Sequence, residues 1–117
     1  MEFNAMFQPI NIGPMTVKNR FVVPPMGNNF ANTDGSMSEQ SAAYYRERAK
    51  GGFGLITIEA TVVHKGAKGG PRKPCLYDDS PIESFSKVVD ACHAEGEKVA
   101  DQMQIAGPDG QEKTDSA

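Results

Sequence analysis

Two consecutive prolines limit how this chain can fold. Pro24 and Pro25 follow a short apolar run, residues 21–23, and neither proline can donate a backbone hydrogen bond to a neighbouring strand. The run is therefore predicted to be a buried strand that ends at Pro24. Gly27 then lets the backbone turn tightly or approach a ligand closely. The stretch indicates either an ordinary strand end or the floor of a site for a flat apolar ring.

Strand and helix patterns alternate along the rest of the chain. Apolar residues alternate on both sides of Gly13-Pro14, which predicts a hairpin over residues 9–20. Helical patterns are predicted over 38–50 and 80–96, and each precedes an apolar run, at 53–63 and 98–105. Strands separated by helices require βαβ crossovers. We therefore expect an α/β fold with three parallel strands whose open edges need cover.

Capping residues mark the start of both predicted helices. Ser38 is the expected N-cap of the first helix, and Gly51-Gly52 is expected to end it. At the second helix, Ser80, Pro81 and Glu83 combine an N-cap, a proline at the first helical position and a capping-box glutamate.

The second predicted strand carries a carboxylate at its carboxyl end. Glu59 suits either a structural hydrogen bond or a functional group, and Ala60 is expected to end the strand. The loop that follows, residues 64–79, is long and rich in Gly, Lys and Pro, which is typical of functional or mobile loops. Its basic residues suit either a solvated surface or the phosphate group of a bound molecule: Lys65, Lys68, Arg72 and Lys73.

Composition argues against several classes of partner. The 117 residues support one modest domain, and a net charge of −3 with both signs interspersed suggests neither nucleic acid nor an anionic membrane. The amino terminus lacks the pattern of a signal peptide, and we expect no membrane span, so a cytoplasmic location is expected. Cys75 and Cys92 are expected to be free thiols, and the Cys and His spacing predicts no metal site.

Three stretches of this sequence resemble a known enzyme family. They are FQPINIGPMTVKNRFVVPPMG at residues 7–27, the Asp34-Gly35 pair, and YYRERAKGGFGLITIEATVV at residues 44–63. Together they resemble the amino-terminal part of the old yellow enzyme family, in the branch of NADH:flavin oxidoreductases and dienoyl-CoA reductases. The resemblance extends from Phe7 to Gly107.

That resemblance implies a fold and an activity. The family forms an eight-stranded TIM barrel that holds FMN at its carboxyl-terminal face and uses NAD(P)H to reduce small α,β-unsaturated substrates. Such a barrel takes about 250 residues. Residues 1–107 would form a partial TIM (β/α)8 barrel, comprising the hairpin, three strands and two helices, and residues 108–117 a polar, disordered tail. The chain would be a truncated piece, inactive alone.

The resemblance also implies six flavin-binding positions. They are Pro24, Pro25, Met26, Gly27, Ala60 and Gln102. The first three would contact the flavin through their backbone, Gly27 would tune it, and Ala60 would pack near the ring. Gln102 would hydrogen-bond the pyrimidine edge, since an amide both donates and accepts.

The chain departs from the family after Gln102. The family pattern QLxHAGR becomes QMQIAGP here, with Ile105 and Pro108 in place of His and Arg. No catalytic residue is assigned, and an iron–sulfur cluster is expected only in a full-length relative. The alternatives are a non-catalytic half-barrel, which either associates with itself through exposed sheet edges or complements a partner, and a degenerate remnant.

Overall fold

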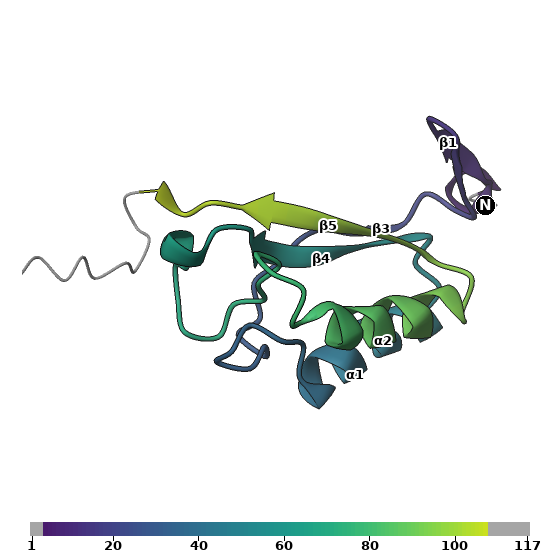
Figure 1. Ribbon diagram of the computed structural model, residues 1–117. Helices are drawn as coiled ribbons and strands as arrows, with labels where there is room; N and C mark the ends of the chain where they lie inside the picture. The colour runs from purple at the N-terminus through teal and green to yellow at the C-terminus, as the bar shows by residue number, and fades with distance from the viewer. Residues whose placement is uncertain (1–3, 108–117) are drawn as a thin grey trace, which may run out of the picture.

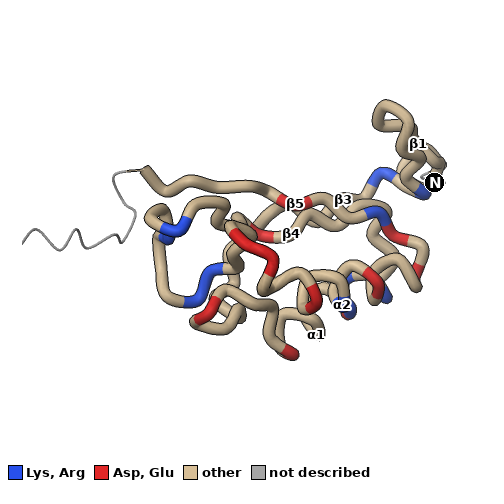
Figure 2. Tube along the Cα trace, viewed as in Figure 1, with Lys and Arg blue, Asp and Glu red and all other residues tan. Residues whose placement is uncertain are grey.

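The computed structural model describes residues 4–107 and shows a three-stranded sheet with two helices against it and a separate two-stranded hairpin (Figure 1). Charges of both signs are spread along the chain (Figure 2). In chain order the elements are η1 (Asn4–Phe7), β1 (Ile10–Ile12), β2 (Met15–Val17), β3 (Val22–Val23), α1 (Glu39–Lys50), β4 (Leu55–Val62), η2 (Lys65–Ala67), α2 (Ile82–His93) and β5 (Lys98–Gln104). The expected tail, 108–117, lies outside the described residues.

The predicted parallel α/β sheet is confirmed. The strand order is β3-β4-β5, and Ile56 of β4 stands opposite Val23 of β3 and Val99 of β5. Both helices lie on the same face of this sheet (Figure 1). Among the described residues no helix covers the other face. Leu55 and Thr57 are therefore only half-buried, although the apolar run had suggested a strand covered on both faces.

The core lies between the sheet and the two helices. Ile56 and Ile58 of β4 pack against Tyr45 of α1 and Val88 of α2, and all four side chains are buried. Cys92 of α2 completes this core as a free thiol, as predicted, and burial raises its pKa to about 11.

The two helix starts differ from one another. Ser38 caps α1 as predicted, because its side chain accepts a hydrogen bond from the Ser41 amide. The predicted capping box of α2 is wrong. The hydroxyl of Ser80 donates instead to Asp78 Oδ1 at 2.6 Å, and the helix starts one residue later, after Pro81. The Asp78 carboxylate accepts from both the amide and the hydroxyl of Ser80, which holds this serine in a tight turn before the helix.

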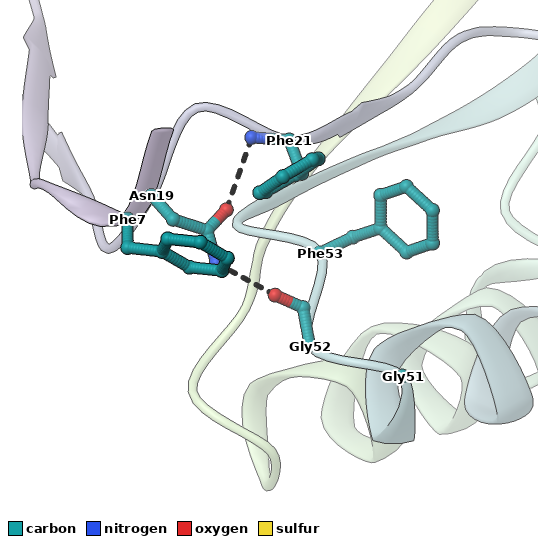
Figure 3. Close-up of a pocket in the computed structure, with 6 residues that line it drawn as sticks. All are labelled: Phe7, Asn19, Phe21, Gly51, Gly52 and Phe53. Atoms are coloured by element: carbon teal, nitrogen blue, oxygen red, sulfur yellow. Dashed lines mark hydrogen bonds between the residues drawn. The ribbon is translucent and has the colours of Figure 1, made fainter. Parts of the chain in front are cut away.

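The β1–β2 hairpin is fastened at the amino ends of the parallel strands (Figure 3). Asn19 donates through Nδ2 to the Gly52 carbonyl at 2.7 Å and accepts from the Phe21 amide at 3.1 Å. A β-carbon on Gly54 would meet Asn19 Oδ1 at 2.7 Å, so this junction has no room for a larger residue. The aromatic rings of Phe7, Phe21 and Phe53 line a cavity of about 220 Å³ there.

Neither α1 nor α2 is long and apolar enough to cross a membrane, and the other described residues contain no helix that is.

Candidate functional site

The predicted flavin-binding positions lie at the opposite end of the sheet from the hairpin. Pro24 and Pro25 follow β3 directly and end it, as predicted. A β-carbon built on Gly27 would stand 3.8 Å from Glu59 Oε2, so the turn after β3 reaches the side of β4. In a parallel sheet the strands' carboxyl ends meet at one edge, which is where barrel enzymes carry their sites.

An irregularity in β4 brings two more of these positions together. Ile58 pairs with Asp101 and Thr61 pairs with Met103, so Glu59 and Ala60 together stand opposite the single residue 102. This is the arrangement of a β-bulge. Ala60 of β4 therefore lies opposite Gln102 of β5.

The same irregularity corrects two expectations. Ala60 does not end the strand and Glu59 is not at its carboxyl end, because β4 continues to Val62. The strand resumes normal pairing after the extra residue, so the loss of register at Glu59 is local.

The surface formed by these positions is accessible. Met26 is 48% exposed, Gln102 is exposed, and Ala60 and Pro25 are half-buried. An apolar side chain, a small residue and a free amide thus lie at neighbouring strand ends. Such a set can pack against a flat apolar ring and hydrogen-bond its polar edge.

Glu59 makes the structural hydrogen bond that one interpretation of the sequence suggested. Its side chain is fully buried, and Oε2 accepts from the Asn28 amide at 3.1 Å. The Glu59 amide in turn donates to the Tyr45 hydroxyl at 2.9 Å. Burial raises the pKa of Glu59, and Asn28 and the nearby Lys73 ammonium partly offset that rise. The carboxylate thereby ties the turn after β3 to the sheet.

Asp101 is the second carboxylate of this region. Its Oδ1 accepts from the Thr61 hydroxyl at 2.7 Å, while its buried Oδ2 has no hydrogen-bond partner in the described structure. Burial raises the pKa of Asp101 above its ordinary value.

Two hydrogen bonds fasten the basic loop of residues 64–79 to the molecule, although Lys65 and Arg72 are exposed. Lys68 Nζ donates to the Thr33 carbonyl at 2.9 Å, and Arg72 Nε donates to the Ala31 carbonyl at 3.0 Å. These two side chains hold the loop that follows β3. In Figure 2 the basic segments of residues 64–79 lie at the end of the sheet away from the hairpin.

Sequence reasoning did not find every residue of this site. It missed Asn28, whose amide binds Glu59 and whose buried Nδ2 has no hydrogen-bond partner within residues 4–107. A second asparagine, Asn29, adopts a positive φ of 58°, which asparagine tolerates better than most residues. In the sequence, the Asn28-Asn29 pair directly after the proline turn was the pattern that could have indicated these two residues.

The described residues fit one wall of an FMN site. Asn28 Nδ2 and Glu59 Oε1 are buried polar atoms without partners, and Gln102 presents its amide at the open surface. Unpaired buried polar groups are uncommon unless a ligand or water satisfies them. Within residues 4–107 no cluster of His, Cys, Asp and Glu suits a metal ion.

Comparison with solved structures defines the class of fold. The 2-naphthoyl-CoA reductase in complex with 2-naphthoyl-CoA superposes with a TM-score of 0.89 at 33% identity, over 93% of this chain and 17% of that one. The old yellow enzyme from Trypanosoma cruzi gives 0.84 at 34% identity, over 92% of this chain and 29% of that one. These relatives are TIM barrels, so the predicted partial (β/α)8 barrel is confirmed.

The family follows from the sequence match. Residues 5–116 match the NADH:flavin oxidoreductase / NADH oxidase family, and the chain belongs to it. The chain is 38% identical over 106 residues to an NADH oxidase of Thermoanaerobacter brockii, covering 90% of this chain. It is 34% identical over 107 residues to a cinnamate reductase of Clostridium sporogenes. It spans 16% of the length of each of these relatives.

Proposed function

We propose that the chain forms the first part of an FMN-dependent oxidoreductase of the old yellow enzyme type. FMN, when bound, supplies hydride acceptance from NAD(P)H and hydride delivery to an α,β-unsaturated substrate. The described residues contribute one wall of the cofactor site. Family membership and the accessible surface at the carboxyl ends of β3, β4 and β5 support this assignment.

The observation that carries the proposal is the juxtaposition of Ala60 and Gln102. The register shift in β4 places this small residue opposite the exposed amide. A small side chain admits a planar ring close to the backbone, and the amide donates to and accepts from the polar edge of that ring. Pro24 and Pro25 keep the neighbouring strand end rigid without offering donors that compete.

The same proposal predicts no alkene reduction by the chain alone. Three strands enclose the cofactor on one side only, and exclusion of water is part of how such a site works. Purified chain supplied with FMN and NAD(P)H should leave an enone unchanged.

Flavin titration tests the binding role directly. The full chain should quench FMN fluorescence saturably, and Gln102→Leu should weaken the affinity by about tenfold, the usual cost of one good hydrogen bond. Gln104→Leu is the matched control, because Gln104 is an exposed glutamine of the same strand. Equal affinity for all three proteins, or no saturable binding by the unmodified chain, would contradict the proposal.

A second function is favoured by the exposed end of β5. Met103 and Ile105 are 72% and 66% exposed, and within residues 4–107 β5 pairs only with β4. An unpaired strand edge with apolar side chains is prone to join another chain. A half-barrel that self-associates would sediment as a dimer or larger, and Met103→Lys with Ile105→Lys should return it to a monomer. A monomer before substitution would exclude this role.

A further inference from the structure

The prolines after β3 determine where Lys73 lies. Since β3 stops at Val23, the edge of β4 beyond it is open, and the long loop returns to occupy that edge. The Val62 amide donates to the Pro74 carbonyl at 2.8 Å, and the Leu76 amide donates to the Val62 carbonyl at 2.8 Å. Val62 also pairs with Gln104 of β5, so the returning loop segment around Cys75 pairs with the other edge of β4, the edge that faces away from β5. Lys73, which directly precedes Pro74, therefore lies beside the turn after β3.

The ammonium of Lys73 occupies the space that a side chain at position 27 would fill. A β-carbon built on Gly27 would stand 2.9 Å from Lys73 Nζ. Glycine at this position therefore allows the close approach of the lysine. The side chain of Lys73 is half-buried and makes no hydrogen bond or ion pair with the other described residues.

The groups around Lys73 are also incompletely satisfied. Glu59 is fully buried and uses Oε2 for the Asn28 amide, while its Oε1 lacks a partner among residues 4–107. Asn28 Nδ2 is a buried donor with no acceptor in that part of the chain. Lys73 Nζ thus stands beside Gly27 in the turn after β3, and Asn28 Nδ2 belongs to that turn, which the Glu59 carboxylate holds in place. Leaving such donors unpaired costs free energy, which an acceptor on a ligand would recover.

We propose that Lys73 is a further ligand-binding residue of this site, whose ammonium donates to an acceptor atom of the flavin ring. The proposal rests on the proposed function. The ring is favoured over the phosphate because Lys73 stands over Gly27, next to the exposed apolar side chain of Met26. Glu59 acts as a positioning residue, since it fixes the Asn28 amide and attracts the ammonium.

The test compares two flavins and two lysines in the full chain. FMN and lumiflavin, which lacks the ribityl phosphate, are titrated by fluorescence into the unmodified protein, Lys73→Met and Lys65→Met. Lys65 is an exposed lysine of the same loop, so its removal controls for the loss of one positive charge. Near-ultraviolet circular dichroism checks that each variant keeps the fold. We expect Lys73→Met to weaken both flavins by about tenfold and Lys65→Met to change neither by more than about twofold.

Each other outcome has a distinct meaning. Unchanged affinity of Lys73→Met for both flavins would overturn the Lys73 contact while leaving the proposed function in place. A loss confined to FMN would show that Lys73 binds the phosphate and would overturn the assignment to the ring. Equal losses in Lys73→Met and Lys65→Met would show a long-range charge effect and no contact. Absence of flavin binding by the unmodified chain would overturn both proposals.

Discussion

Asp101 illustrates how a single residue can oppose the stability of its own surroundings. A buried charge without a partner is costly, and within residues 4–107 only one of the two side-chain oxygens of Asp101 has a hydrogen-bond partner. Burial is the largest cause of its raised pKa, and the Thr61 hydroxyl offsets that rise in part.

Replacing Asp101 with asparagine should stabilise the chain at neutral pH. Because its folded-state pKa is raised, Asp101 favours the folded state while protonated, and that contribution is lost as the pH rises through the raised pKa. We expect Asp101→Asn to increase the free energy of unfolding at pH 7 by on the order of 1 kcal/mol. The gain should vanish as the pH falls to the ordinary carboxyl value of 3.8.

Urea denaturation at several pH values measures this difference. Asp79→Asn is the control, because it removes the same charge from an exposed position that precedes α2. A gain of equal size for both variants, or a gain for Asp101→Asn that persists at low pH, would count against the buried carboxylate as its cause.

At the scale of single elements, the two helices should respond differently to loss of a serine. Ser38→Ala removes the side-chain acceptor for the Ser41 amide and should cost about 1 kcal/mol of folding free energy. Ser80→Ala removes only a surface hydrogen bond to Asp78 and should change stability by less than about 0.5 kcal/mol. Denaturant midpoints of both variants decide the matter. A larger loss from Ser80→Ala would mean that this serine caps α2 in solution.

The elements that could be predicted from sequence are those with local causes. The prolines at 24 and 25 end β3 whatever surrounds them, and the apolar spacing of 38–50 forms a helix. The remaining features depend on competition between neighbouring residues or on distant partners. At Ser80 a turn closed by the Asp78 carboxylate competes with capping of the helix, and the position of Lys73 follows from pairing between Val62 and Pro74. The local sequence at Ser80 fits either arrangement, and the position of Lys73 leaves no local pattern at all.

At the scale of the whole molecule, the described fold is one part of a barrel and should function inside a complete one. A chimaera tests this, in which the chain replaces its matching segment of the Thermoanaerobacter brockii NADH oxidase, to which it is 38% identical. We expect the chimaera to retain bound flavin and to oxidise NADH at no less than about a tenth of the parent rate, since fold and core type are shared. Deletion of the segment is the control and should abolish flavin binding. A soluble chimaera without bound flavin would contradict the proposal that this chain forms one side of the flavin site.

The bulge in β4 has a consequence for how this strand can evolve. Two residues there face one on β5, so the side chains before and after it alternate out of step by one position. Deleting either Glu59 or Ala60 would leave one residue opposite Gln102 and restore regular pairing, with Thr61 still opposite Met103 and on the face of Asp101, its present hydrogen-bond partner. The sheet can therefore accommodate loss of one residue at this point, but losing Glu59 would remove the acceptor of the Asn28 amide and losing Ala60 would remove the small residue opposite Gln102.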